Sequence, residues 1–586
     1  MNKVSLFTTI FLCCVLLTYR LWHSDLNHKP LKLTTYDAFG YYMYLPKLLI
    51  YKDLQLNWLK PIDAKYHVVG SEDVYQAGKV ANGNYVCSYF AGVALLELPF
   101  FLIAHNTAQS LGFEADGFSP PYQYALVFGV LFYAFLGLFM LRKVLLYYFD
   151  DSTTALTLSL IILASNIIQY ISIDSLQSHA FIFPLYAIVL FASHKWHQKP
   201  RFSYALLTGF ICGLATLCRP TEAIIFLIPL LWQTNTKENA AVKWQTVRDN
   251  KTHLWAAIIA GLSVLSLQFI YYKYVSGSFL HVVGSRWTFL NPFFRVLFGF
   301  EKGWFVYTPV TILFILGLFK MRAYAFNKSV IWFSILNIWI IISWYDWQYG
   351  ASYSTRALTQ SYPVFALSLA ALIAFINQKN KMIKFPFYAL SIYLVGVNLF
   401  QLNQYDTTVL HYKDMNRQYY GRIYLNNKPN SLDISLLDTR DWLDTEGSCQ
   451  SEIVANKDSL VYLSTKNGLT VCELKYDSTV VNNFKPIKIN KNYLKVETEL
   501  LIKNGFWNSY ISTEISNNKI IVNSNQIRLF NPIAKEGENN KYAYYIKIPN
   551  DLMFYDLKIA IKVDNDEFNG VLNHLKITHY YYTRLQ

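Results

Sequence analysis

Charged side chains are scarce in this sequence of 586 residues: Asp, Glu, Lys and Arg together make up 15% of it. A soluble domain usually carries about 25%. The net charge is nevertheless +14, and 53% of the residues are hydrophobic. A basic nucleic-acid-binding protein would show charge-rich faces and a less apolar chain, so that class is excluded. No internal repeat or low-complexity stretch is present, which excludes a repeat architecture.

Cysteine is also sparse, with seven residues in the chain, and none has the spacing of zinc ligands. A structural zinc site is therefore excluded. Five of them fall in or beside long apolar runs: Cys13, Cys14, Cys87, Cys212 and Cys218. The other two, Cys449 and Cys472, lie in a more polar segment, where the sequence fits a disulfide and a pair of free thiols equally well.

The positive charge is unevenly distributed along the chain. Residues 1–404 hold 30 Lys and Arg against 17 Asp and Glu, whereas residues 405–586 hold 22 against 21. Long apolar runs recur only in the first part, and a membrane span needs about 20 mostly apolar residues. We therefore expect a membrane domain at 1–404 and a separate domain at 405–586. The candidate spans are 4–22, 88–108, 122–147, 153–171, 179–194, 203–218, 221–233, 254–275, 304–319, 329–343, 358–376 and 385–402.

The loops between these runs indicate an orientation, because short cytoplasmic loops are enriched in Lys and Arg. Five loops are clearly basic: 142–143, 195–201, 237–251, 320–328 and 379–384. Placing them in the cytoplasm puts the intervening loops and everything after 402 outside. The first run follows only Lys3 and lacks a small-residue cleavage site, so we expect an uncleaved first span with a cytoplasmic N-terminus.

Twelve crossings would return the C-terminus to the cytoplasm, which conflicts with this orientation. The segment 88–108 contains Glu97 and Pro99 and precedes an acidic loop without Lys or Arg. We therefore expect about 11 crossings, with 88–108 lying in the outer face as an interfacial or re-entrant helix. The alternative explanation is that the crossings are wrongly assigned in the short hairpin 203–233.

The tail has a different pattern from the membrane part. Alternating apolar runs at 459–464, 493–502, 519–522 and 542–548 are separated by turn pairs such as Asn467-Gly468 and Asn504-Gly505. This pattern is typical of an antiparallel β-sandwich. By strand pattern it resembles jelly-roll modules that bind carbohydrate. Trp442, Trp507 and Tyr510 could stack on sugars or pack in the core.

Asp37 stands out in the first outer loop, at 23–87. Thr34 or Thr35 can cap a helix there, and Asp37 then occupies its first turn, where the helix dipole favours a carboxylate. Tyr41, Tyr44, Leu45 and Leu48 follow at helical spacing and form an aromatic-rich stripe suited to a membrane interface. Asp37 is thus either a reactive carboxylate at the lipid–water boundary or a residue that only stabilises the helix.

Four places in the first 400 residues carry a resemblance to a known family. They are Tyr36-Asp37 with Gly40-Tyr41-Tyr42, Ser178-His179 after a loop with Asp174, Gly209 to Gly213 followed by Cys218-Arg219-Pro220-Thr221, and Trp344-Tyr345-Asp346-Trp347 through Gly350 to Arg356. Together they resemble integral-membrane glycosyltransferases of the GT-C fold, in particular the bacterial relatives of protein O-mannosyltransferases and the lipid A aminoarabinose transferase. Eukaryotic mannosyltransferases have Asp-Glu where this chain has Asp37-Ala38, so that exact activity is not assigned.

The resemblance implies an inverting transfer from a sugar on a polyprenyl phosphate to an acceptor hydroxyl at the outer leaflet. Such a transfer needs a base near the attacking hydroxyl, for which Asp37 is the candidate. The leaving phosphate needs cations, and the candidates from the outer loops are Arg219, Arg356, Lys302 and Arg286. Candidates for orienting the acceptor or holding a divalent metal are Asp174 and His179, with Asp53 and Asp346 in reserve; no cofactor is certain.

Two other classes fit a multi-span protein. A transporter or flippase of lipid-linked sugars would carry ionisable residues deep in its spans, and few are present here. A surface-polysaccharide polymerase or ligase usually has its large functional loop late in the chain, whereas here the long loop comes first. We therefore expect a glycosyltransferase of a bacterial inner membrane with lipid-linked sugar and the bilayer as its partners. The sequence does not identify the acceptor, and it indicates no nucleic acid.

Overall fold

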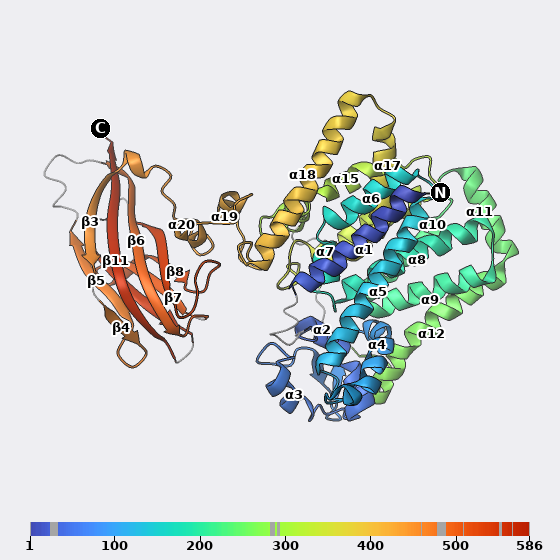
Figure 1. Ribbon diagram of the computed structural model, residues 1–586, viewed down its shortest axis with the longest axis horizontal. Coiled ribbons are helices and arrows are strands. Elements are labelled where there is room, and N and C mark those ends of the chain that lie inside the picture. Colours follow the sequence, from blue (N-terminus) through green and yellow to red (C-terminus); the bar gives the residue numbers. More distant parts are fainter. Residues whose placement is uncertain are drawn as a thin grey trace. The chain divides into compact units, whose positions relative to one another are not determined.

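The computed structural model describes residues 2–23, 33–281, 287–289, 293–458, 460–477, 488–507, 509–549, 552, 554–564 and 567–584. Contacts divide the chain into two compact units, Met1–Leu402 and Asn403–Gln586. The first unit is almost wholly helical and the second is mainly β-sheet (Figure 1).

The first unit is a bundle of long and short helices with one small β-hairpin (Figure 1). Its α-helices are α1 (Lys3–His23), α2 (Tyr36–Tyr42), α3 (Leu59–Tyr66), α4 (Gly92–Ala108), α5 (Pro120–Leu145), α6 (Asp151–Leu163), α7 (Ile167–Ser172), α8 (Ser178–Gln198), α9 (Phe202–Cys218), α10 (Leu227–Leu231), α11 (Lys237–Asp249), α12 (Lys251–Ser276), α13 (Phe293–Phe298), α14 (Trp304–Tyr307), α15 (Val310–Leu318), α16 (Asn327–Ile342), α17 (Tyr362–Asn377) and α18 (Lys381–Asp406). Shorter turns of other helix types are η1 (Pro46–Tyr51), η2 (Gln109–Leu111), η3 (Pro220–Phe226) and η4 (Arg356–Ser361), and the hairpin pairs β1 (Ala77–Lys79) with β2 (Tyr85–Cys87).

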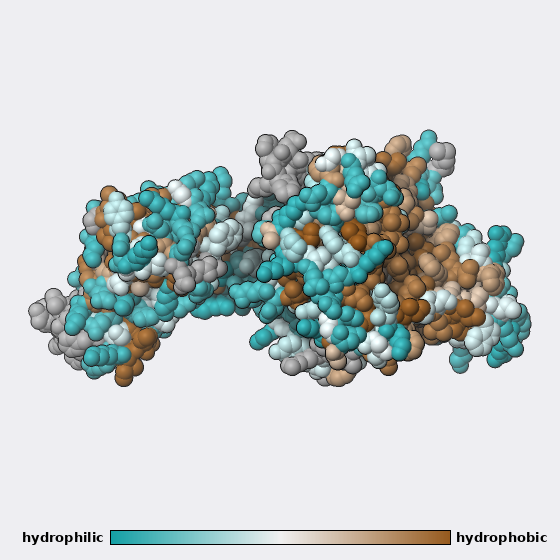
Figure 2. Space-filling model, turned by 90° about the horizontal axis from the view of Figure 1, so that it is seen from below, coloured by the Kyte–Doolittle hydropathy of each residue, from teal (hydrophilic) through white to brown (hydrophobic). Residues whose placement is uncertain are grey.

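Five helical segments are long and apolar enough to cross a membrane: Lys3–His23, Pro120–Leu145, Lys251–Ser276, Arg356–Asn377 and Lys381–Asp406. Four shorter apolar helical segments accompany them. Figure 2 shows a broad brown, hydrophobic area on the surface of this unit. The expected helical membrane domain followed by a β domain is thus confirmed, while the number of crossings and the placement of 88–108 stay predictions.

The basic loops of this unit gather at one end of the bundle. Lys195 belongs to the basic loop 195–201 and lies over the ring of Tyr147, which follows the basic loop 142–143. The distance from Lys195 Nζ to the ring centroid is 4.7 Å. Lys320 and Lys379, from two other basic loops, both lie over Phe375, at 4.0 and 4.2 Å. Tyr148, which follows the basic loop 142–143, makes ring contacts with three residues near two other basic loops. These are Trp232, before 237–251, and Tyr324 and Phe326, within 320–328. The basic loops therefore share one side, as the orientation argument requires.

Helices α9 and α12 pack unusually closely. A Cβ atom on Gly209 would lie 1.9 Å from the backbone oxygen of Ala257, and one on Gly213 would lie 2.6 Å from that of Gly261. Small residues four apart allow two helix backbones to approach in this way in a membrane. The close packing fixes the position of the C-terminal end of α9, which leads into Arg219.

The second unit begins with two short helices, α19 (Arg417–Ile423) and α20 (Ser431–Ser435), and a turn, η5 (Glu446–Ser448). Two antiparallel sheets follow, with strand orders β5-β10-β7-β8 and β3-β11-β6-β9, and β4 pairs with β11. The strands are β3 (Gln450–Lys457), β4 (Val461–Ser464), β5 (Thr470–Asp477), β6 (Lys488–Asn504), β7 (Ser509–Asn517), β8 (Ile520–Arg528), β9 (Asn539–Lys547), β10 (Phe554–Val563) and β11 (Asn569–Arg584).

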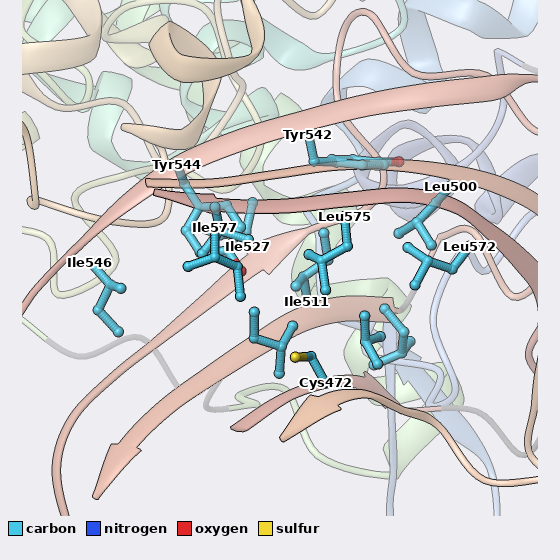
Figure 3. Close-up of a cluster of buried hydrophobic side chains, with 14 of the residues drawn as sticks. Cys472, Leu500, Ile511, Ile527, Tyr542, Tyr544, Ile546, Leu572, Leu575 and Ile577 are labelled. Carbon is cyan, nitrogen blue, oxygen red and sulfur yellow. The ribbon is translucent and has the colours of Figure 1, made fainter. Parts of the chain in front are cut away.

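Alternating residues of the two sheets form one core. Leu500, Leu575 and Ile577 come from one sheet and Ile511 and Ile527 from the other, and each is at most 4% exposed (Figure 3). Alternation of this kind is what buries one face of each strand in a sandwich. The predicted β domain is therefore confirmed.

The structure distinguishes between some of the alternatives that the sequence left open for this unit. Cys449 and Cys472 are both free thiols, as are the other five cysteines. Trp507 is 64% exposed and stacks on Phe530, with 3.9 Å between ring centroids, so it is not a core residue. Trp442 lies under the guanidinium of Arg422 at 4.3 Å.

Candidate functional site

The backbone just before Asp37 is held in an unusual conformation. Tyr36, the first residue of α2, has a φ of 53°, in the left-handed region that a tyrosine rarely adopts. Its carbonyl accepts a hydrogen bond from the Gln76 side chain at 3.2 Å, and its amide donates to the Val68 carbonyl at 3.1 Å. Contacts with this distant loop therefore enforce the strained residue, which is typical of positions that aim a functional side chain.

The Asp37 carboxylate is engaged on both of its oxygens. Oδ2 forms an ion pair with Arg356 Nη2 at 2.5 Å. Oδ1 accepts hydrogen bonds from the hydroxyls of Tyr89 at 2.7 Å and Tyr75 at 3.1 Å. The Asp37 side chain is still 26% exposed, so a small molecule could reach it.

These contacts set the pKa of Asp37. Burial by itself would raise this pKa, but the Arg356 charge and the hydrogen bonds from Tyr89, Arg356 and Tyr75 outweigh burial and hold it below its ordinary value. Asp37 is therefore a carboxylate at neutral pH. For both tyrosines, burial and the Asp37 charge raise the pKa of the hydroxyl, so each hydroxyl stays protonated and donates.

Gly40 makes room for Tyr89. A Cβ atom at residue 40 would lie 2.3 Å from the Tyr89 ring, which real side chains do not tolerate. On the other side, Tyr89 packs edge-on against Tyr41, with 4.6 Å between centroids. The glycine in the Gly40-Tyr41-Tyr42 motif thus allows the ring that holds Asp37 to sit directly against α2.

Arg356 lies 319 residues after Asp37 in the sequence and follows the loop between α16 and η4. In this loop Tyr349 and Ser354 have left-handed φ angles of 54° and 57°. Lys302 is 2% exposed and donates to the Ser352 carbonyl at 2.6 Å, while Thr355 donates to the Lys302 carbonyl at 3.0 Å. The structure therefore places Lys302 as a support of this loop and not among the cations open to a substrate.

The Arg356 guanidinium is only partly satisfied. Its Nη1 donates to Gln177 Oε1 at 2.8 Å, and its Nη2 binds Asp37. Its Nε is buried and makes no hydrogen bond within the described part of the chain. Because a guanidinium has five N–H donors, Arg356 can take a further acceptor without losing the Gln177 contact.

Arg219 is the second cation at this end of the bundle. It is half-buried, ends α9 and lies over the Tyr349 ring at 5.9 Å. Among the residues that the structure describes, its guanidinium forms no hydrogen bond or ion pair. Arg219, Asp37 and Arg356 all lie near enough to the Tyr41 hydroxyl to influence its pKa, so the three charged groups surround one side chain. Burial raises the pKa of Tyr41, which donates to Ser178 Oγ at 3.1 Å.

A buried network of hydrogen-bonded side chains lies near Arg219 and Arg356. His179 is 3% exposed and its Nδ1 contacts Gln360 Oε1, whose amide nitrogen donates to Glu222 at 2.6 Å. The Tyr186 hydroxyl donates to the other Glu222 oxygen at 2.6 Å. His179 is thus a buried member of a hydrogen-bond network and is not open to a substrate.

The other predicted site residues do not join Asp37. Asp174 accepts from Gln169 at 3.4 Å. Asp53 accepts the backbone N–H groups of Gln55 and Asn57, which makes it a turn residue. Asp346 is exposed in the loop before Arg356, and Arg286 lies outside the described residues.

No group of three or more His, Cys, Asp and Glu residues is placed to hold a metal ion in the described ranges. Asp174 and His179 are thus not part of such a group, and metal binding by these two residues stays a prediction. Sequence reasoning also missed Tyr75, Tyr89 and Gln177, which lie in loops without periodicity. The expected aromatic stripe is buried within the protein: Tyr41, in α2, and Tyr44, just after it, are 8% and 4% exposed, because they pack against Tyr89 and Tyr271.

Comparison with known proteins gives no sequence relative, since no family model and no curated protein matches. Solved structures do align. The oligosaccharyltransferase of Archaeoglobus fulgidus in its apo form aligns with 71% of this chain at 12% identity and a TM-score of 0.40. The archaeal oligosaccharyltransferase AglB from the same organism, in complex with an inhibitory peptide and a dolichol-phosphate, aligns with 72% at 12% identity and a TM-score of 0.39.

ArnT from Cupriavidus metallidurans in the apo state aligns with 56% of this chain at 13% identity and a TM-score of 0.36. In each case the alignment spans 57% of the other protein's length. The oligosaccharyltransferase and ArnT are glycosyltransferases of the GT-C fold, the class that the sequence resembles.

Proposed function

We propose that this protein is a membrane glycosyltransferase that moves a sugar from a polyprenyl-phosphate donor to an acceptor hydroxyl, with inversion at the anomeric carbon. The observation that supports this most is the convergence of one carboxylate, Asp37, with two guanidinium groups, Arg219 and Arg356, at the end of the bundle opposite the basic loops. A base and an anion site side by side are what such a transfer requires.

Asp37 is the proposed general base. The acceptor hydroxyl attacks the anomeric carbon, the bond from that carbon to the phosphate oxygen breaks, and the bonding electrons leave with the phosphate. The hydroxyl proton passes to Asp37. Because burial and two tyrosines position the carboxylate, its approach to the hydroxyl is fixed in advance.

Arg219 and Arg356 are proposed to hold the donor phosphate. The departing phosphate gains one negative charge during the reaction, which a nearby guanidinium stabilises most when water is excluded. Arg219 is suited to this task because it has no anionic partner within the described residues. Arg356 retains a buried Nε without a partner there.

The lipid carrier is proposed from the setting of the site, at one end of a bundle with an apolar surface (Figure 2). A polyprenyl tail can stay in the bilayer while its phosphate reaches Arg219. With the basic loops in the cytoplasm, this site and the β domain are extracytoplasmic, and the membrane is the inner membrane of a bacterium. The sugar is a hexose or pentose, and the acceptor is a glycan, lipid or protein hydroxyl.

The test uses purified full-length protein, a panel of polyprenyl-phosphate sugars and detection of released polyprenyl phosphate. Asp37→Asn keeps the shape of the side chain but removes the base, so we expect transfer to fall by about 10²- to 10⁴-fold. Thermal unfolding checks that the variant is folded, and Asp37→Glu is the matched variant that keeps a carboxylate. Wild-type rates in a folded Asp37→Asn enzyme would exclude Asp37 as the base.

A further inference from the structure

The ion pair between Asp37 and Arg356 raises a conflict within the site. A general base must offer a lone pair to the incoming hydroxyl, but Tyr75 and Tyr89 already take both acceptor sites of Oδ1, and the remaining site on Oδ2 lies beside the Arg356 cation. A carboxylate bound in this way is also a weaker base, because a cation beside it favours the charged form. In this structure Asp37 is well positioned, but its contact with Arg356 hinders it from accepting a proton.

The same ion pair also lowers the anion affinity of the site. Arg356 is 11% exposed, and its positive charge is neutralised by Asp37 at 2.5 Å. Arg219 alone is left as a cation without an anionic partner in the described part of the chain. An incoming phosphate would therefore meet one free guanidinium and one that the base already occupies.

Both conflicts have one resolution. We propose that Arg356 is shared between the base and the donor: it pairs with Asp37 in the donor-free enzyme, and the donor phosphate draws it away, so that Asp37 can accept a proton only after the donor has bound. This inference rests on the proposed function and adds a control step to it.

The geometry of Arg356 fits such a transfer. Gln177 holds Nη1 at 2.8 Å, which provides a pivot, while Nη2 carries the Asp37 contact and Nε has no partner within the described residues. A small rotation about the Gln177 contact can thus exchange a carboxylate for a phosphate oxygen. When Arg356 leaves, Tyr75 and Tyr89 still hold Asp37 Oδ1, so the base keeps its position and frees only Oδ2.

The charges balance at each stage. With a donor phosphodiester bound, two guanidinium groups face two negative charges, one on Asp37 and one on the phosphate. During transfer the proton goes to Asp37 and the bonding electrons go to the phosphate, which becomes a dianion. The two negative charges are then both on the phosphate, where Arg356 has moved. When polyprenyl phosphate leaves, Asp37 releases its proton and recovers Arg356.

The arrangement sets the order in which the two substrates bind productively. Water or an acceptor that arrives before the donor meets a carboxylate tied to Arg356, so binding is ordered, with the donor first.

Other charged and titratable groups face Asp37 from each neighbouring element, and they define what a pH measurement will report. Tyr75 and Tyr89 come from the loop segments around the β-hairpin and Tyr41 from α2 itself, and each has a raised hydroxyl pKa. Arg219 and Arg356 are cations from α9 and η4. None of these groups changes charge in the acidic range. His179 and Glu222, in the network beside the two arginines, do titrate there, so the fall in activity at low pH is assigned to Asp37 where the infrared titration of its carboxyl gives the same pH.

The test compares two pH profiles of the wild-type enzyme. The profile of kcat/KM for the donor reports the donor-free enzyme, and that of kcat at saturating donor reports the complex. An arginine beside an aspartate lowers its pKa by about 1–3 units, so we expect the acid limb of kcat to lie about 1–3 pH units above that of kcat/KM. Infrared titration of the Asp37 carboxyl, with and without polyprenyl phosphate, should show the same upward shift without turnover.

Two matched variants separate the shared arginine from a cation that only binds phosphate. In Arg356→Gln the two acid limbs should coincide, because no guanidinium holds Asp37 in either state. In Arg219→Gln the donor KM should rise while the gap between the limbs remains. Arg356→Lys keeps the charge without the planar fork and serves if the glutamine variant does not fold.

The possible results separate the sharing of Arg356 from the proposed glycosyltransferase function. Coincident limbs in the wild type, together with an inactive Asp37→Asn enzyme, would overturn the sharing of Arg356 and leave the proposed function standing. An active Asp37→Asn enzyme would overturn both. A gap that persists in Arg356→Gln would assign the control step to another group.

Discussion

Replacing Tyr89 by phenylalanine tests how the structure tunes Asp37. The change removes one hydroxyl, which donates to Asp37 Oδ1 at 2.7 Å, and keeps the ring that Gly40 accommodates. A hydrogen bond to a charged group contributes about 1.5–3 kcal/mol. Since one pKa unit corresponds to about 1.36 kcal/mol, losing this bond should raise the Asp37 pKa by about 1–2 units. The partial exposure of Asp37 favours the lower end of that range.

The role of Asp37 as a base determines the direction in which the pH profile shifts. Asp37 must be ionised to accept a proton, so activity is present above its pKa and is lost as the pH falls through that value. Tyr89→Phe should therefore move the acid limb of donor kcat/KM upward by about one pH unit, while the rate at neutral pH changes by less than about tenfold. The assay is release of polyprenyl phosphate across a pH series.

Tyr75→Phe is the matched control. Its bond to Asp37 is longer, at 3.1 Å, and the side chain is 43% exposed, so the shift should be smaller than for Tyr89→Phe. Equal shifts in the two variants would refute the ranking by distance and burial. An unmoved acid limb in Tyr89→Phe would refute the reasoning that this hydroxyl tunes the base.

Three further predictions concern the support of the site and the topology. Gly40→Ala would push a Cβ to 2.3 Å from the Tyr89 ring, so it should raise the acid limb as Tyr89→Phe does and lower the melting temperature too; an unchanged limb would contradict it. Gly209→Val should separate α9 from α12, because a Cβ there meets the Ala257 carbonyl at 1.9 Å; we expect a lower melting temperature, with Gly396→Ala, whose Cβ meets nothing within 4 Å, as the neutral control. A cysteine at Thr35 should react with an impermeant thiol reagent added outside intact cells and one at Asn380 should not, and reversed labelling would invert the orientation.

The sequence predicts the charged groups of the site better than their supports. The sequence predicts Asp37 from its place in an outer-loop helix and Arg219 and Arg356 as outer-loop cations, and the structure pairs Asp37 with Arg356 and places Arg219 near the same tyrosine, Tyr41. Their pairing could not be predicted, since the contact between Asp37 and Arg356 spans 319 residues of sequence. Tyr75 and Tyr89 lie in a loop whose pattern gives no indication of which side chains point inward.

The errors have a common physical cause. The sequence predicts Lys302, from an outer loop, as a cation for the phosphate and His179, at the start of a span, as a residue for the acceptor or a metal. Both are buried here and bonded to segments distant in sequence, Lys302 to Ser352 and His179 to Gln360. The predicted aromatic stripe that begins at Tyr41 has the spacing of an interfacial helix. That spacing is equally consistent with a helix packed within the protein.

The close packing of α9 on α12 gives the two cations different mechanical characters. Arg219 follows a helix whose glycines lie against a neighbouring backbone, so its Cα is as rigid as the bundle. Arg356 follows a loop with strained residues and pivots on a single side chain. A rigid cation stabilises the departing phosphate without reorganisation energy, whereas a cation that moves adds that energy to the barrier. The division of labour suggests that Arg219 contributes mainly to the chemical step and Arg356 to its timing.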